Sequence, residues 1–229
     1  MNEFELTGRA RSHIVDLRDP PCSLHFEAAT SFLAMRDAAA LDGVALCARS
    51  SFREFDAQLK IWNAKWAGER PIYDRQGNAL DRRQLSDSQA VEAILSWSAL
   101  PGGSRHHWGS DVDIFDAAAA PAGYKVQLIP AEYAADGVFA RLTSWLDANM
   151  RRYGFFRPYG TDRGGVSPEP WHLSYAPVSL PALESLSLSL LRHVLEASAL
   201  AGKTQVLARL PEIYTRFMLA VDPPEFAGG

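Results

Sequence analysis

The sequence DVDIF at residues 111–115 alternates acidic and apolar side chains, and this alternation restricts the folds that the chain can adopt. Successive side chains of a β-strand point to opposite faces. Val112 and Ile114 would therefore pack on a core, whereas Asp111 and Asp113 would point away from it into a cleft. We expect a sheet with one face on the core and the other face carrying carboxylates.

Hydrophobic periodicity elsewhere predicts short strands and helices in mixed order, with hairpin-like rather than βαβ spacing. Helices are predicted over 24–41, 54–67, 86–97, 136–153 and 183–194, with one or two more in 202–218. Strands are predicted over 44–52, 111–115, 124–130 and 171–177. Residues 1–22 are expected to be irregular and 68–87 a long loop. The run SLSLSLL also alternates like a strand, so the helix around it has an alternative. The pattern favours an α+β fold with a small antiparallel sheet and flanking helices.

Composition narrows the classes of function. A length of 229 residues with 47% hydrophobic residues suits one globular domain, and a net charge of −4 argues against a nucleic-acid partner. No segment is long and apolar enough to predict a membrane span, and the N-terminus lacks a hydrophobic signal core. As written, the chain is expected to be cytoplasmic, with periplasmic or cell-wall action open by another route. The sequence does not decide the oligomeric state.

The segment SRHHWGSDVDIFD, residues 104–116, combines imidazole and carboxylate groups. His106 lies seven residues before Asp113, so one straight strand would place the two on opposite faces. Gly109 permits a bend that lets them converge. Cys22 and Cys47 lie far apart without a C-x-x-C pattern, so a metal here must rely on histidine and carboxylate, and zinc accepts both. The alternative is a solvated loop followed by a polar sheet face.

A second segment, SPEPWHLSY at residues 167–175, places Glu169 three residues before His172. Pro168 and Pro170 exclude a helix there, so the pair is expected at a corner between a loop and a strand. Such a corner would let a metal-binding histidine and a glutamate base converge. The alternative is a tryptophan and a histidine packing a strand end, with an incidental surface glutamate.

Together these motifs resemble the VanY-type D-alanyl-D-alanine carboxypeptidases, zinc peptidases of the lysostaphin, D-Ala-D-Ala peptidase and hedgehog superfamily. That family carries S-x-H-x-x-G-x-A-x-D, followed later by E-x-W-H. The matching positions here are Ser104, His106, Gly109 and Asp113, then Glu169, Trp171 and His172. Asp111 replaces the alanine of the motif, which predicts a more acidic pocket wall.

A third family element, approximately S-G-Y-R-S-x-x-x-Q, is similar to SSFREFDAQ at residues 50–58. Ser51 stands for the glycine and Phe52 for the tyrosine, while Arg53 and Gln58 match. The segment RRYGFFRPY also contains the family's Y-G-F stretch. The resemblance covers residues 24–177. The chain is therefore divided into an N-terminal arm at 1–23, a catalytic domain at 24–177 and a helical C-terminal extension at 178–229 packed on the same domain.

The resemblance implies a role for each matched position. His106, Asp113 and His172 would bind Zn²⁺ and leave one coordination position for water. Glu169 would take a proton from that water and later deliver it to the departing amine. The implied reaction is removal of the C-terminal D-alanine from peptidoglycan stem peptides. A D,D-dipeptidase, an L,D-carboxypeptidase, an endopeptidase and a silent zinc- or peptide-binding module are the alternatives.

The remaining matched residues would contact the substrate. Arg53 would hold the scissile carbonyl, although a surface ion pair with Glu54 or Asp56 is the alternative. The expected substrate-binding residues are Ser104, Gln58 and Trp171. His107 would line the pocket, support a ligand or lie on the surface, and a shift of register would make it the ligand instead of its neighbour. Asp111 would orient a ligand histidine or be solvated.

Overall fold

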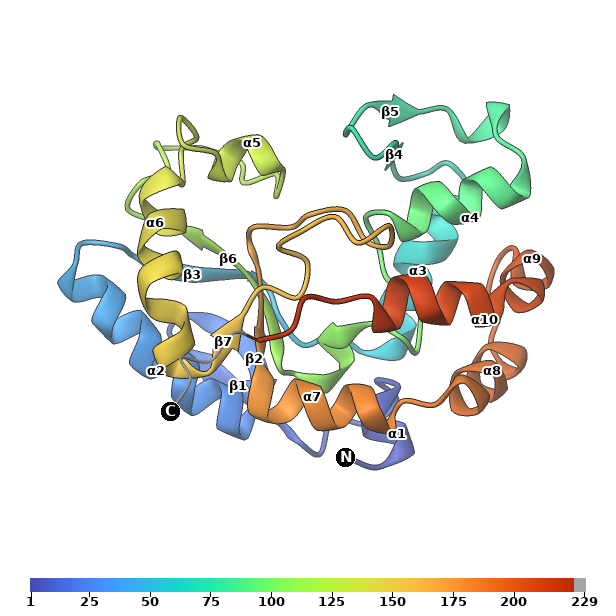
Figure 1. Ribbon diagram of the computed structural model, residues 1–229, viewed down its shortest axis with the longest axis horizontal. Coiled ribbons are helices and arrows are strands. Elements are labelled where there is room, and N and C mark those ends of the chain that lie inside the picture. The colour runs from blue at the N-terminus through green and yellow to red at the C-terminus, as the bar shows by residue number, and fades with distance from the viewer. Residues whose placement is uncertain (225–229) are drawn as a thin grey trace.

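The computed structural model describes residues 1–224 and has a four-stranded antiparallel sheet at its centre (Figure 1). The strand order is β3-β6-β8-β7. The strands are β3 (Leu46–Ser50), β6 (Asp111–Asp116), β8 (His172–Tyr175) and β7 (Phe155–Phe156). Helices surround this sheet, and the expected α+β architecture with a small antiparallel sheet is confirmed.

The alternation in β6 divides the sheet as its sequence predicts. Val112 and Ile114 are fully buried in one apolar cluster together with Leu173 of β8. On the other face, Asp113 lies directly opposite His172 in the β6–β8 register. The pairing of these two strands therefore brings a carboxylate and an imidazole from distant parts of the chain side by side.

The apolar face of the sheet packs on two helices, α2 (Phe26–Leu41) and α6 (Ala140–Asn149). Phe32 and Leu142 are fully buried there. Figure 1 shows both helices on the same side of the molecule as the edge strand β3.

A second apolar core lies at the other end of the sheet and joins the middle of the chain to its C-terminal helices. Its helices are α3 (Phe55–Trp66), α4 (Asp87–Leu95), α8 (Leu188–Ala197), α9 (Lys203–Ala208) and α10 (Leu210–Ile213), followed by a π-helical turn at Tyr214–Leu219. Trp62 is fully buried and donates its indole N–H to the Ala201 carbonyl, at 3.0 Å. The part of the predicted extension from α8 onward thus packs on α3 and α4, while its last five residues, 225–229, lie outside the described residues.

The expectation of an irregular first segment is wrong. Residues 1–25 contain α1 (Glu3–Leu6) and a hairpin of β1 (Ile14–Arg18) and β2 (Pro21–His25). Pro21 is the first residue of its strand, a position where a missing N–H is tolerated.

The predicted strand at 124–130 is also wrong, because this segment wraps around a carboxylate instead of pairing with a strand. The buried Glu132 side chain accepts the backbone N–H groups of Gln127, Leu128 and Ile129 at 2.8–3.3 Å. Leu128 has a φ of +57°, which a regular strand does not permit. A short helix, α5 (Pro130–Tyr133), follows at once.

Several other helix and loop boundaries differ from those predicted from the sequence. The expected loop at 68–87 contains a small hairpin of β4 (Ile72–Tyr73) and β5 (Ala79–Leu80) and a 3₁₀ turn at Arg82–Gln84. Helix α6 begins after Phe139 rather than at an Asp136 cap. The predicted helix at 183–194 is divided into α7 (Ala176–Ser185) and α8, because the Ser187 hydroxyl accepts the N–H of Leu190 and starts a new helix. Across residues 1–224, no helix meets the length and hydrophobicity needed to cross a membrane.

Gly109 is predicted to be necessary for the packing of the β1–β2 hairpin behind the site. Its φ is +66°, and an added Cβ would lie 2.3 Å from Ile14 Cδ1 and 2.6 Å from the His25 nitrogen. Gly109→Ala should lower the free energy of unfolding by more than the about 1–2 kcal/mol expected for a left-handed alanine. Urea unfolding checks this value.

Gly123→Ala is the matched control for this substitution. Its φ is +77°, but nothing lies within 4 Å of the added Cβ. It carries the same backbone strain without the clash. Equal losses of stability in the two variants would contradict the role of close packing at Gly109.

Candidate metal centre and catalytic cavity

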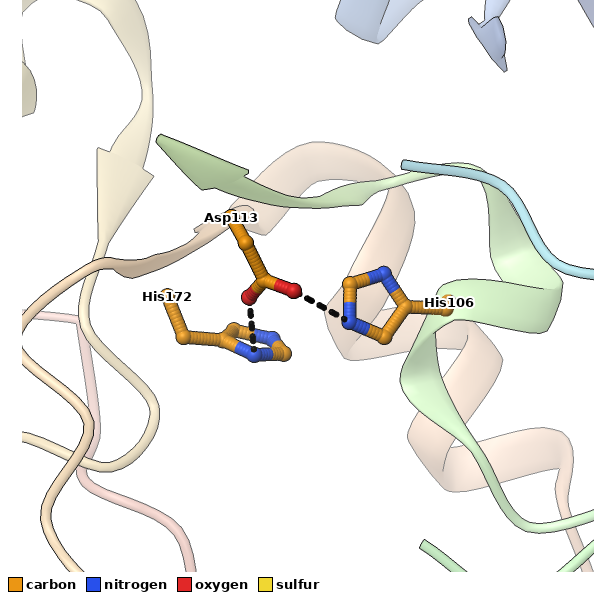
Figure 2. A group of neighbouring side chains, drawn as sticks. All are labelled: His106, Asp113 and His172. Atoms are coloured by element: carbon orange, nitrogen blue, oxygen red, sulfur yellow. Dashed lines mark ion pairs between the residues drawn. The ribbon is translucent and has the colours of Figure 1, made fainter. Parts of the chain in front are cut away.

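Three side chains that the sequence predicts as metal ligands lie together in the structure (Figure 2). His106 lies on a 3₁₀ turn, Arg105–Trp108, while Asp113 lies on β6 and His172 on β8. All three are buried, and one donor atom from each lies within 4.8 Å of the others. His106 Nε2 is 3.4 Å from Asp113 Oδ2, and His172 Nδ1 is 3.2 Å from Asp113 Oδ1.

Glu169 lies beside this cluster, with its Oε2 atom 3.3 Å from His172 Nδ1. The expected corner is present: the His172 N–H donates to the Glu169 carbonyl at 3.1 Å, and the Glu169 N–H donates to the Tyr159 carbonyl at 2.8 Å. This turn directs two side chains three residues apart to the same place, which a straight strand would not do.

The electrostatics of the cluster favour a bound cation. Burial alone lowers the pKa of His172, but its contacts with the carboxylates of Asp111, Asp113 and Glu169 outweigh it and raise that pKa well above its usual value. Burial raises the pKa of Asp113, whereas His106 and His172 hold it far below its usual range. The carboxylates around His172 thus attract positive charge, which a proton or a metal ion can supply.

Asp111 supports His172 from behind and does not form part of the cavity wall. It is fully buried, and its Oδ1 atom lies 2.8 Å from His172 Nε2 and 2.8 Å from Arg105 Nε. Ser174 Oγ donates to its other oxygen at 3.1 Å, and Ser110 Oγ also donates there. In the neutral ring, an N–H at His172 Nε2 leaves the lone pair on Nδ1, which faces Asp113 and Glu169. A carboxylate that fixes the tautomer in this way is common behind metal-binding histidines.

His107 has a different environment from His106 and is not among the clustered donors. Its Nε2 atom accepts the Gly102 N–H at 3.1 Å, so its Nδ1 carries the proton and donates to the Arg53 carbonyl at 2.6 Å. Complete burial lowers the pKa of His107 to about 3 and keeps the ring neutral. This histidine therefore holds the backbone at Arg53.

Arg53 lies in the cavity wall with neutral partners. Its Nη1 atom donates to Gln58 Oε1 and its Nη2 atom to Ser50 Oγ, both at 2.7 Å. The alternative of a surface ion pair is wrong: within residues 1–224, neither Glu54 nor Asp56 pairs with it. Gln58 is fully buried behind the guanidinium, and its amide donates to the Ala99 carbonyl at 2.7 Å. The structure thus places Gln58 against Arg53 and outside the residues that line the cavity.

The three clustered donors, Glu169 and Arg53 line one cavity of about 810 Å³. The lining includes Arg53, Lys65, Ser104, His106, Asp113, Tyr159, Glu169, Trp171 and His172. Ser104 Oγ is buried without a hydrogen-bond partner among the described residues. Trp171 is buried and packs on Tyr133, with ring centroids 5.6 Å apart.

Two lining residues were not predicted as site residues, although Tyr159 ends the segment RRYGFFRPY. The Tyr159 ring meets the His172 ring edge-on at 5.1 Å, and burial raises the pKa of its hydroxyl to about 12. Lys65 lines the cavity from α3, where the sequence predicted a helix but no site residue near its C-terminal end. The positions of Tyr159 and Lys65 in the cavity wall depend on contacts between segments far apart in the chain. Local sequence patterns do not predict such contacts.

The donor set fits zinc. Two imidazoles and one carboxylate are typical of catalytic zinc sites, which keep a coordination position for water. Asp113 Oδ1 and His106 Nδ1 are buried without a hydrogen-bond partner among residues 1–224. The unpartnered carboxylate oxygen faces the other donors and is available to a cation.

Two strands of the sheet and one 3₁₀ turn thus bring together a donor set that could hold a metal ion, with a glutamate beside it. The chain matches the VanY family of D-alanyl-D-alanine carboxypeptidases over residues 21–178 and belongs to this family.

Two relatives are similar to parts of the chain. An uncharacterized protein of Haemophilus influenzae is 47% identical over 98 residues, which are 42% of this chain and 67% of that protein. A D-alanyl-D-alanine carboxypeptidase of Enterococcus faecalis is 32% identical over 145 residues, which are 61% of this chain but only 43% of that protein.

Among solved structures, VanYB in complex with D-Alanine-D-Alanine is similar, with 24% identity and a TM-score of 0.53 over 81% of this chain and 88% of that chain. A mutant of the vancomycin resistance D,D-pentapeptidase VanY, in complex with Zn(II), has 23% identity and a TM-score of 0.52 over 84% and 88% of the two chains. At this identity the likeness establishes the fold.

Asp111→Asn is predicted to lower the affinity for zinc by about 10–100-fold, the usual effect of losing an outer partner of a metal ligand. The amide no longer fixes the His172 tautomer with a negative charge. Isothermal titration calorimetry of the metal-free protein with zinc measures this affinity.

Ser174→Ala is the control, because it removes one hydrogen bond to Asp111 and leaves the bond to His172 in place. Its zinc affinity should stay within a few-fold of the wild type. Unchanged affinity in Asp111→Asn would contradict the role given to the carboxylate.

Proposed function

We propose that this protein is a zinc-dependent carboxypeptidase that hydrolyses the C-terminal D-alanine peptide bond of peptidoglycan stem peptides. The observation that supports this most is the convergence of His106, Asp113 and His172 within 4.8 Å, with Glu169 adjacent. A purely structural zinc site has no use for a free carboxylate beside its ligands. Membership of the VanY family supports the choice of substrate.

His106, Asp113 and His172 would hold the zinc ion. When bound, zinc supplies a Lewis acid that can polarise a carbonyl and lower the pKa of water. The protein's own groups then manage the proton. Glu169 accepts it from the attacking water and returns it to the amine of the departing D-alanine, so that one carboxylate acts first as base and then as acid.

Arg53 holds the oxygen of the scissile carbonyl in this proposal. Gln58 and Ser50 occupy one N–H on each terminal nitrogen, so further donors of the guanidinium remain for the substrate. Gln58 acts as a positioning residue through its two bonds, to Arg53 and to the Ala99 carbonyl. His107 fixes the Arg53 backbone from the other side.

Ser104 and Trp171 complete the substrate contacts. The unpartnered Ser104 hydroxyl would bond to the substrate backbone, since buried polar atoms normally find a partner. Trp171 and Tyr159 line the cavity beside the ligands and would exclude water from the reacting bond.

Glu169→Gln is predicted to keep one zinc per chain and to lower kcat by about 10²–10⁴-fold, the usual contribution of a general base. His172→Ala should lose both zinc and turnover. Mass spectrometry of tetrapeptide and pentapeptide stems after digestion, with metal analysis of the same samples, measures both quantities.

The products of the wild-type protein also distinguish the alternatives. Conversion of pentapeptide to tetrapeptide supports the proposal. Conversion of tetrapeptide to tripeptide indicates an L,D-carboxypeptidase, cleavage of free D-alanyl-D-alanine indicates a dipeptidase, and cleavage within cross-linked peptides indicates an endopeptidase. Peptide binding without any product would identify a silent binding module.

Arg53→Met is predicted to lower kcat by about 10²–10³-fold, as expected for a lost donor to a developing oxyanion. Arg49→Met is the matched control, since Arg49 is exposed on β3, just before Arg53 in the chain, and lies outside the cavity lining. Steady-state kinetics and a far-UV circular dichroism spectrum of each variant check the result. Normal kcat in folded Arg53→Met would remove this arginine from the mechanism.

A further inference from the structure

Lys65 is a cation in the catalytic cavity for which the mechanism above has no role. It is half-buried on α3 and lines the same cavity as Arg53, Glu169 and the three metal-site residues. Within residues 1–224, no carboxylate forms an ion pair with its ammonium group. A partly desolvated cation without an anion is unfavourable unless a ligand supplies the charge.

Lys65 lies on the same helix as Gln58, whose side chain contacts Arg53. It lies seven residues after Gln58, which is about two turns and within about 20° of the same helix face. Side chains of a helix lean toward its N-terminus, so Lys65 leans toward the end of α3 that carries Gln58 and follows Arg53. Its charge interacts with those of Arg53 and Glu169.

Some of the cationic side chains that line the cavity pair with a carboxylate and others do not. Two other lining cations already have partners, because Arg105 pairs with Asp111 at 2.8 Å and Arg75 with Asp162 at 2.5 Å. Lys65 has no such partner, and Arg53 has only the neutral groups of Ser50 and Gln58. The wall on the α3 side therefore offers two cations to an incoming anion.

We propose that Lys65 binds the C-terminal carboxylate of the substrate and thereby makes the site select peptides with a free C-terminus. One residue of extended chain spans about 3.3–3.6 Å, so a terminal carboxylate lies close behind the scissile carbonyl that Arg53 holds. An endopeptidase substrate would bring no charge to this position. The inference rests on the proposed function and deepens it, since it concerns the substrate of the same site.

The protonation state of Lys65 is compatible with this role. Burial lowers its pKa to about 8, while the Glu169 charge acts in the opposite direction. At neutral pH the amine is therefore still mainly a cation. Lys65 therefore adds a positive charge without a carboxylate partner to the cavity wall.

A binding experiment separates this role from turnover. In the Glu169→Gln background, the affinity for a synthetic peptide ending in D-alanyl-D-alanine and for its C-terminal amide is measured by calorimetry in the zinc-loaded protein. Lys65→Met should weaken binding of the free acid by about 10–100-fold, the range for a hydrogen bond to a charged group, and leave the amide unaffected. Lys65→Arg should restore most of the loss.

Lys60→Met is the matched control, because Lys60 is exposed on the same helix and outside the cavity lining, and the substitution changes the net charge equally. It should alter neither affinity. Equal binding of the free acid by Lys65→Met and the parent, or equal weakening of acid and amide, would overturn the inference.

Kinetics of the otherwise wild-type protein distinguish failure of this inference from failure of the proposed function. Lys65→Met should raise KM for the free acid by about the same factor and change kcat little, because the interaction is uniform binding. Turnover of stem peptides with an unchanged KM would refute only the role of Lys65. Absence of turnover in the wild type, together with acid-selective binding that depends on Lys65, would refute the carboxypeptidase reaction and keep the subsite.

Discussion

The antiparallel pairing of β6 with β8 is the constraint on which the candidate site depends. In this register Asp113 lies opposite His172, and the same pairing sets Asp111 opposite Ser174. A shift by one residue would turn the carboxylates into the core, because side chains alternate between faces. Val112 and Ile114, which are fully buried, oppose such a shift. The apolar core therefore fixes the register, and the register places the reacting groups.

Behind the cluster, the buried charges are stabilised by mutual contact. Burying a carboxylate is unfavourable unless charge and hydrogen bonds offset the loss of water. Asp111 satisfies this condition with Arg105, Ser110, Ser174 and His172. An aspartate at the position where the related motif has alanine thus changes the support of His172 rather than the cavity wall.

The cavity lies where the two apolar cores of the fold meet. One core anchors the sheet that carries Asp113 and His172, and the other anchors α3, which carries Lys65 and follows Arg53. The C-terminal helices from α8 onward belong to the second core. Their packing on α3 therefore contributes to the placement of the α3 wall, although they supply none of the clustered donors.

The sequence by itself determined the parts of this protein that depend on local pattern. The alternation in DVDIF specified a two-faced strand, Gly109 the bend after His106, and the prolines around Glu169 a corner instead of a helix. These features follow from backbone geometry over a few residues, which the sequence states directly. Which histidines and acids would meet followed from the resemblance of their motifs to the VanY family, since the residues alone left a solvated loop and a packed strand end as alternatives.

Only the tertiary structure decided what depends on contacts between distant segments. The strand expected at 124–130 was lost because Glu132 captured its backbone N–H groups. Asp111 became a buried support once Arg105 and His172 enclosed it, and Gln58 turned to Arg53 instead of the cavity. Lys65 acquired its position from the packing of α3 against the second core. Such contacts join residues far apart in the chain, and local periodicity carries no information about them.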